Sequence, residues 1–465
     1  MSTIRIIERF IESNSTLERF VKEILERVPI RFRYGMSYGP TFRYWLGFLM
    51  ESEKWDRDRL MAYQLEQMKN LLIHAGNNVP YYKRIFAEYG FRPEKFADLE
   101  DLKILPYIDR QIVKKHYEDF IATNIPKKRL IAATTSGSTG VPLIVYGTKE
   151  TEEKHWATVV NLWNRIGYCP ESKTIFFEAD VRKGKTSVPY KKYANKLIIS
   201  SNYFIDIWID EFVRLINDFR PEYIIGFPHT IAAFASHIKR LGQSIYNGLN
   251  GIIVYAENLY KWQREIIENI LGARILSDYG MAEKVIHGGG CEHSDAYHLY
   301  PQYGYTEYFK LKDSCYEFVA TGFTNYAMPL IRYRTGDTCA AVNDGCLSCG
   351  RNYDIVTNIE GRISDFLVNR EGEIFSVYLN IDYDTLRDID RFQLYQDTPG
   401  YVELKIWPRH KNVDIEMVAN AINSCFGPHR DRIKLKIAVM DHRELHNSVK
   451  FKMIDQRLDM RNFLT

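Results

Sequence analysis

The spacing of apolar residues changes along the chain and divides it into segments of different kinds. In residues 61–90, apolar side chains recur at helical intervals until a Gly-Asn-Asn-Val-Pro string interrupts them. From about residue 130, short strand-like runs alternate with helical stretches. These runs are LIAATTS, TIFFEAD, KLIISSNYF, YIIGFP, GIIVYA and ARILSDYG. Because strands separated by helices tend to pair in parallel, the pattern predicts an α/β domain with a substantial parallel sheet.

The pattern changes near residues 360–370, and a short α+β segment follows. The strings RFQLYQ, YVELKIWP and IKLKIAVM are typical of strands, whereas VDIEMVANAINSCF is typical of a helix. The sequence therefore predicts three parts. They are a helical N-terminal extension over 1–60, a large α/β domain with mixed sheets over 61–364 and a small α+β domain over 365–465.

Composition favours an ordinary soluble globular protein. Hydrophobic residues make up 45% and charged residues 26% of the 465 positions, and the net charge of +3 gives no reason to expect nucleic-acid binding. The chain has no apolar run of the roughly 20 residues that a membrane helix needs and no signal-peptide pattern, so we expect a cytoplasmic protein. Seven cysteines, an odd number, fit a reducing compartment. The aromatic and basic stretch over 31–50 permits a membrane-surface role, but an arm packed on the body is the preferred interpretation.

Hydroxyl side chains and glycines are concentrated at residues 134–143, TTSGSTGVPL. Gly137 and Gly140 allow the backbone to approach an anion, and the serines and threonines add neutral donors. The stretch is not a Walker loop, because it contains no Gly-Lys-Ser/Thr string. Taken alone, such a composition is more often that of a plain surface loop.

Four further motifs follow this stretch in a fixed order. They are SDYGMAE at 277–283, IRYRTGD at 331–337, EGRISD at 360–365 and SVKFKMIDQR at 448–457. Together with the hydroxyl-rich stretch, they resemble the core motifs of adenylate-forming enzymes, the acyl-CoA synthetase superfamily. The chain is most similar to the phenylacetate–CoA ligase branch, including members found with capsular-polysaccharide genes. The resemblance covers about residues 60–460 and implies that the small C-terminal domain is a mobile lid.

The resemblance implies a role for each motif. Nucleotide binding falls to Thr135, Ser136, Gly137, Ser138, Thr139, Gly140, Asp278, Tyr279, Gly280, Asp337 and Arg362. The stretch from Thr135 to Gly140 would hold the β- and γ-phosphates, Tyr279 would stack on adenine, and Asp337 would accept hydrogen bonds from the ribose hydroxyls. Without the resemblance, the stretch at 135–140 would be a solvent loop, Asp337 a turn aspartate and Arg362 a solvated arginine beside a hinge.

Two residues are implied in catalysis itself. Glu283 would hold Mg²⁺ against the phosphates, and Lys450 would bridge the substrate carboxylate and the α-phosphate. Lys452 stays an alternative to Lys450. Val449 and Ser364 depart from the family pattern, which puts closure of the small domain in doubt.

Cysteines and histidines form a second constellation. Cys346 and Cys349 have the spacing of two thiolates on one tetrahedral ion, Cys291 offers a third sulfur, and His293 or His298 offers the nitrogen. Some relatives carry a structural zinc on such a set, and the spacing in that resemblance favours His298. The alternative to a metal site is that these are four unrelated residues of a cytosolic protein.

The function implied is that of an AMP-forming acid ligase. ATP and Mg²⁺ would convert a small carboxylic acid, for which an aryl acid is a candidate, to an acyl-adenylate and pyrophosphate. The acyl group would then pass to CoA, a carrier-protein thiol or an amine. Phe227, His229 and Tyr255 are candidates to line the acid pocket, although each alone is more often a core residue. The alternatives are transfer of AMP to a phenolic acceptor and a catalytically silent nucleotide-binding relative.

Overall fold

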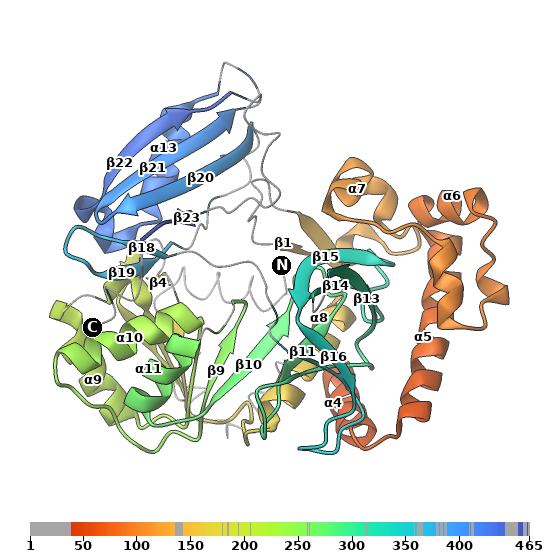
Figure 1. Ribbon diagram of the computed structural model, residues 1–465, viewed down its shortest axis with the longest axis horizontal. Coiled ribbons are helices and arrows are strands. Elements are labelled where there is room, and N and C mark those ends of the chain that lie inside the picture. Colours follow the sequence, from red (N-terminus) through yellow and green to blue (C-terminus); the bar gives the residue numbers. More distant parts are fainter. Residues whose placement is uncertain are drawn as a thin grey trace. The chain divides into compact units, whose positions relative to one another are not determined.

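A computed structural model describes most of the chain (Figure 1). The residues outside the description are 1–38, 135–142, 179, 184–185, 194, 205, 258, 260, 313–314, 358, 360–365, 378–380, 382–384, 386–387, 409, 411–412, 442–453, 459–462 and 464–465. The predicted phosphate stretch at 135–140, Arg362 and Lys450 fall outside it, as does most of the predicted N-terminal extension. These assignments therefore stay predictions.

The chain divides into two compact units. The first comprises Met1–Thr135, Leu143–Glu171 and Leu276–Gly361. The second comprises Ser136–Pro142, Ser172–Ile275 and Arg362–Thr465.

Helices of the first unit begin and end at local sequence signals. They are α4 (Pro40–Ser52), α5 (Arg57–Asn78), α6 (Pro80–Glu88), α7 (Arg110–Lys115) and α8 (Lys149–Asn164). The Asp56 carboxylate accepts a hydrogen bond of 2.8 Å from the backbone N–H of Arg59 and so caps α5. Pro80 begins α6, where its missing N–H costs no helical hydrogen bond. The predicted helix over 61–90 is thus confirmed, with its break at the Val-Pro step.

The strands of the first unit are antiparallel. One group has the order β16 (Ala341–Asp344), β17 (Asp354–Thr357), β12 (Tyr297–Leu299), β11 (His287–Gly290) and β10 (Ile275–Gly280). A separate three-stranded sheet consists of β13 (Gly304–Lys312), β14 (Cys315–Gly322) and β15 (Tyr333–Cys339). The predicted strand at the start of the run near residue 130 is β1 (Ile131–Thr134), which pairs antiparallel with β2 (Ile144–Gly147). A nearby following strand can pair in this way without a helical crossover.

The second unit contains the predicted parallel strands. Their order is β9 (Gly251–Tyr255), β8 (Tyr223–Gly226), β3 (Thr174–Glu178), β7 (Lys196–Ser200) and β6 (Tyr190–Lys192). Pairing is parallel from β9 to β7 and antiparallel between β7 and β6. Helices α9 (Asp206–Phe219), α10 (Pro228–Arg240) and α11 (Lys261–Leu271) contribute to the core of these strands. The α/β class with mixed sheets is confirmed.

The C-terminal segment has a small sheet of its own. Its order is β22 (Lys434–Val439), β21 (Tyr401–Pro408), β20 (Ile389–Thr398) and β23 (Ile454–Gln456). Helix α13 (Ile415–Ser424) shares a core with this sheet, with Val418 and Ile422 buried beside Leu394 and Leu404. The short hairpins β4 (Val181–Lys183) with β5 (Thr186–Val188), and β18 (Phe366–Val368) with β19 (Ile374–Ser376), complete the described strands.

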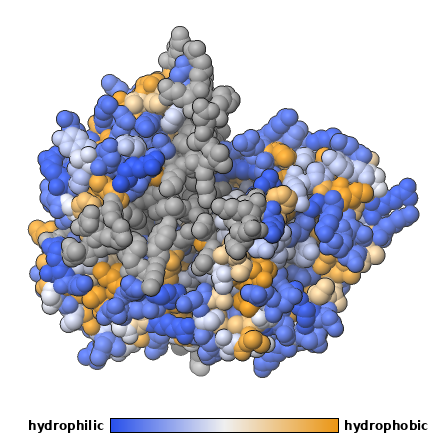
Figure 2. Space-filling model, viewed as in Figure 1, coloured by the Kyte–Doolittle hydropathy of each residue, from blue (hydrophilic) through white to orange (hydrophobic). Residues whose placement is uncertain are grey.

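Hydrophilic residues cover much of the described surface on the face in Figure 2, and hydrophobic residues form small groups there. Within the described ranges, no helix is both long enough and apolar enough to cross a membrane.

Candidate nucleotide site and metal centre

The structure brings two of the predicted nucleotide residues into direct contact. Tyr279 lies near the end of β10, and Asp337 lies on β15. The Tyr279 hydroxyl donates a hydrogen bond of 2.9 Å to Oδ2 of Asp337. Burial, followed by the charge of Asp337, raises the pKa of Tyr279 well above its usual range, so the phenol remains the donor. The pair therefore joins residues 58 positions apart within one unit.

Asp337 lies in a bulge of β15. Arg334 pairs with Val319 and Thr338 pairs with Glu317, so three residues of β15 oppose Phe318 alone. Gly336, at the centre of the bulge, has φ of +78°, a conformation that glycine adopts without strain. The Thr335 hydroxyl accepts a hydrogen bond of 3.0 Å from the Asp337 backbone N–H and donates one to the Phe318 carbonyl. The Thr-Gly-Asp string is thus an ordered strand irregularity.

Glu283 is the last residue of the motif at 277–283 that contains Tyr279, and 3% of its surface is exposed. The Tyr333 hydroxyl donates a hydrogen bond of 3.3 Å to its Oε1 atom. A carboxylate oxygen is the ligand type that Mg²⁺ takes, so the residue fits its predicted role chemically. The sequence prediction did not include Tyr333, although it stands four residues before Asp337 in the same motif.

Asp278, the residue before Tyr279, belongs to a buried polar cluster. The indole N–H of Trp163, on α8, donates a hydrogen bond of 2.8 Å to Oδ2 of Asp278. Nε2 of His287 lies 3.6 Å from Oδ1. Burial raises the pKa of Asp278 to about 7 and lowers the pKa of His287 to about 3, because the interior disfavours both charges. Asp278 therefore contacts the protein interior, and its predicted nucleotide contact stays a prediction.

Gly280 has a packing reason to be glycine. A Cβ at this position would lie 2.8 Å from Nδ1 of His287, closer than side-chain carbons normally come. His287 is buried, so its ring has little room to move. From the sequence, Gly280 is named only among the residues that the resemblance implies in nucleotide binding.

The predicted pocket residues lie in the second unit. The rings of Phe227 and Tyr255 have centroids 5.1 Å apart, and both side chains are half-buried. His229 stands in the first turn of α10, but its side chain is outside the description.

The predicted metal ligands converge in the first unit. Cys291 directly follows β11, His298 lies on β12, and Cys346 and Cys349 lie in the loop between β16 and β17. Their donor atoms all lie within 4.8 Å of one another. Backbone hydrogen bonds hold the loop, from Gly350 N–H to the Cys346 carbonyl (2.7 Å) and from Cys346 N–H to the Arg351 carbonyl (2.8 Å).

The distances suit a tetrahedral zinc ion. With Zn–S of about 2.3 Å and Zn–N of about 2.0–2.1 Å, tetrahedral angles place two sulfurs about 3.8 Å apart and a sulfur about 3.6 Å from a nitrogen. In the structure, Cys291 Sγ and Cys346 Sγ are 3.9 Å apart, and Cys349 Sγ is 3.6 Å from His298 Nε2. Burial, helped by two nearby arginines, lowers the pKa of His298 to about 3, so its ring is neutral, as ligation requires.

Two arginines surround this cluster. Arg351 donates to both carboxylate oxygens of Glu292 and to Glu53, and Arg165 lies 3.4 Å from the same Glu53. Nη1 of Arg165 also lies 3.1 Å from Nδ1 of His298. A guanidinium only donates, so this contact needs a lone pair on Nδ1. A neutral ring that binds zinc through Nε2 carries its proton on Nδ1, so this contact with Arg165 would have to change when the ion binds.

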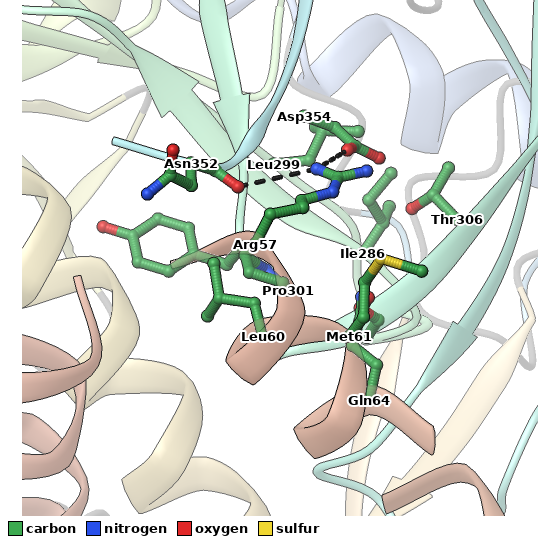
Figure 3. Close-up of a pocket in the computed structure, with 12 residues that line it drawn as sticks. Arg57, Leu60, Met61, Gln64, Ile286, Leu299, Pro301, Thr306, Asn352 and Asp354 are labelled. Atoms are coloured by element: carbon green, nitrogen blue, oxygen red, sulfur yellow. Dashed lines mark hydrogen bonds and ion pairs between the residues drawn. The ribbon is translucent and has the colours of Figure 1, made fainter. Parts of the chain in front are cut away.

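A small pocket is shown in Figure 3, and its lining does not include Tyr279, Glu283, Tyr333 or Asp337. Arg57 and Met61 of α5 line it, with Asp354 and Thr306 across from them. The Arg57 guanidinium donates to Asp354 at 2.6 Å. The cavity volume of about 20 Å³ holds about one water molecule, so it does not fit a nucleotide.

Several curated proteins are similar to the chain. No family model matches the chain. The phenylacetate–coenzyme A ligase of Thermus thermophilus is 27% identical over 351 residues, which are 70% of this chain and 75% of the relative. The Escherichia coli K12 enzyme of the same name is 28% identical over 366 residues, or 74% and 81%. Protein CapK of Staphylococcus aureus is 23% identical over 319 residues, or 67% and 70%.

A solved structure supports the same fold. The crystal structure of 2-hydroxyisobutyryl-CoA ligase in complex with 2-HIB-AMP and CoA aligns with a TM-score of 0.60 at 15% identity, over 89% of this chain and 93% of that one. The solved structure supports the fold alone. Together with the motifs, the relatives support a similarity to the adenylate-forming superfamily and, within it, to the phenylacetate–CoA ligase branch.

Proposed function

We propose that the protein activates an aryl carboxylic acid with ATP and transfers the acyl group to CoA. A carboxylate oxygen attacks the α-phosphorus of ATP, and the bond to pyrophosphate breaks. The sulfur of CoA then attacks the carbonyl carbon of the acyl-adenylate, and AMP leaves with the bonding electrons as the thiol proton is lost. The observation that carries the proposal is the contact between Tyr279 and Asp337, with Glu283 held by the same strand, in a chain similar to named CoA ligases.

The residues have separate tasks in this proposal. The Tyr279 ring stacks on adenine, and the Asp337 carboxylate accepts hydrogen bonds from the ribose hydroxyls. Glu283 is the ligand for Mg²⁺, which supplies positive charge to the phosphate oxygens when bound. Lys450 and the stretch at 135–140 contact the phosphates and the substrate carboxylate.

CoA is the acceptor that the relatives support, because three of the four named above are CoA ligases. The aryl acid is supported by the name phenylacetate in two of them and by the aromatic pair of Phe227 and Tyr255. A carrier-protein thiol, an amine and a phenolic acceptor for AMP are the competing outcomes of the test.

We also propose that Cys291, His298, Cys346 and Cys349 hold one structural zinc ion. The four donor atoms fill a tetrahedral shell, so no position remains for a substrate. The ion would join the segment after the tyrosine motif to the loop between β16 and β17. Elemental analysis of the purified protein tests this, with one zinc per chain expected.

The test of the activity is acid-dependent exchange of labelled pyrophosphate into ATP. Pools of aryl, fatty, hydroxy and amino acids are compared, with and without CoA. We expect exchange with the aryl pool, and an acyl-CoA product when CoA is added. Lys450→Ala is expected to slow exchange by about 10²-fold or more, because it removes a charge that acts on the transition state, while AMP binding is retained. Lys452→Ala is the matched control.

If a different pool of acids supports exchange, the proposed aryl substrate is wrong and an acid of that pool takes its place. An adenylated acceptor without acyl-CoA would favour AMP transfer. ATP binding without any exchange would favour the silent relative.

A further inference from the structure

One strand contacts both ends of the 277–283 motif. Tyr333 and Asp337 lie four residues apart on β15, and their partners Glu283 and Tyr279 also lie four residues apart. Tyr333, Thr335 and Asp337 occupy alternating buried positions of the strand. The spacing of β15 therefore sets the separation of the two motif residues for which the proposed function has separate tasks.

Tyr333 is itself held firmly. Its side chain is 1% exposed and belongs to the hydrophobic core of the first unit. Its backbone forms an isolated parallel bridge with Ile108, and two hydrogen bonds flank the bridge, from Ile108 N–H to Arg332 and from Arg334 N–H to Ile108. A tyrosine fixed by packing and backbone contacts presents its hydroxyl in a fixed direction.

The hydroxyl meets one oxygen of a buried carboxylate. Glu283 would otherwise rotate about its side-chain bonds, and a buried carboxylate needs a donor or a cation to offset its desolvation. The hydrogen bond from Tyr333 engages Oε1 at 3.3 Å and leaves the lone pairs of Oε2 to another partner.

We propose that Tyr333 is a positioning residue that holds the Glu283 carboxylate in the orientation that binds the divalent cation of a metal–ATP complex. The inference rests on the proposed function, because it takes Glu283 as the cation ligand. Tyr333 itself touches neither the nucleotide nor the cation, and it acts through the carboxylate.

The test compares two tyrosine hydroxyls. Tyr333→Phe removes the donor to Glu283 and keeps the ring in the core. Tyr308→Phe is the matched control, because the hydroxyl of the partly buried Tyr308 also donates to a carboxylate of the same unit, Asp354, at 2.8 Å. ATP affinity is measured by calorimetry over a range of Mg²⁺ concentrations, and AMP affinity is measured without Mg²⁺.

We expect Tyr333→Phe to raise the Mg²⁺ concentration for half-maximal ATP binding roughly tenfold, the scale of a hydrogen bond to a charged group. AMP affinity without Mg²⁺ is expected to stay within about twofold, because the contact between Tyr279 and Asp337 is untouched. Tyr308→Phe is expected to change neither quantity.

Glu283→Gln separates this inference from the proposed function. If ATP binding by the wild type does not respond to Mg²⁺, or Glu283→Gln responds like the wild type, the proposed role of Glu283 fails. If Glu283→Gln loses the response but Tyr333→Phe titrates like the wild type, the role of Glu283 stands and the inference on Tyr333 is overturned. The double variant is expected to match Glu283→Gln alone, since Tyr333 acts only through that carboxylate. A Tyr333→Phe protein that fails to fold beside a folded Tyr308→Phe protein also overturns the inference, because the hydroxyl would then serve stability.

Discussion

The phenol of Tyr279 donates to Oδ2 of Asp337 across 2.9 Å, and this contact joins β10 to β15. The tyrosine hydroxyl engages one oxygen of the carboxylate. The hydrogen bond therefore holds the aromatic face of Tyr279 and the carboxylate of Asp337 at a fixed separation.

Asp337→Ala is expected to weaken AMP binding by roughly tenfold or more, because hydrogen bonds from the ribose to a charged acceptor are lost. Tyr279→Phe keeps the aromatic face and removes only the hydroxyl, so a change below about fivefold is expected. Titration of AMP by calorimetry measures both. An Asp337→Ala protein with wild-type AMP affinity would remove this residue from the site.

The four proposed metal ligands allow a second test. Cys346→Ser is expected to lower the zinc content below one ion per chain and to lower the Tm by about 5 °C or more, because a structural zinc ion contributes several kcal/mol to folding. The matched control is Cys169→Ser, since Cys169 is an exposed cysteine outside the cluster. Elemental analysis and thermal unfolding are the measurements. A Cys346→Ser protein with the Tm of the control would contradict a structural role for the ion.

Spacing along the chain, with the resemblance, predicted the cluster of three cysteines and one histidine, but it did not predict the contacts between motifs. Cys346 and Cys349 are close in sequence, so their convergence follows from one loop. Tyr333, which donates a hydrogen bond to Glu283, is 50 residues away from it in the sequence. Trp163, which donates to Asp278, is 115 residues away from its acceptor. Such pairs depend on which strands and helices pack together, and an isolated tyrosine or tryptophan carries no sign of its partner. The antiparallel pairing of β1 was missed for the same reason, because the composition of a strand does not specify its neighbour.

Burial of Asp278 predicts an unusual pH dependence of stability. Its pKa rises to about 7 in the folded protein from its ordinary value of 3.8, so the folded state holds a proton that the unfolded state loses between these values. This contribution is therefore fully present below about pH 4 and is lost as the pH rises through about 7. At about 1.4 kcal/mol per pKa unit, the total loss is on the order of a few kcal/mol.

Asp278→Asn is expected to remove this fall in stability while keeping an acceptor for the Trp163 indole. Buried His287, whose pKa is lowered to about 3, gives the opposite slope, since the unfolded state gains its proton on acidification. The quantity to compare is thus the difference in Tm between variant and wild type at pH 5.5, 6.5 and 7.5. It is expected to shift in favour of the variant as the pH rises. A difference that does not change with pH would mean that Asp278 titrates normally.

Gly280 and His287 offer a steric test of the strand that carries Tyr279. A Cβ at position 280 would lie 2.8 Å from the buried ring of His287, so Gly280→Ala must displace the ring or β10. We expect a loss of about 1–3 kcal/mol in stability, the scale of overpacking in a core, together with weaker AMP binding because Tyr279 is the neighbouring residue. Gly47→Ala is the control, since a Cβ at that helical position meets nothing within 4 Å, and it is expected to hold or raise the Tm. Adding His287→Ala to Gly280→Ala removes the obstructing ring, so the double variant is expected to lose less stability than the sum of the single changes. Thermal unfolding and AMP titration of the four proteins and the wild type decide the matter: strictly additive losses would show that the two side chains do not compete for this space.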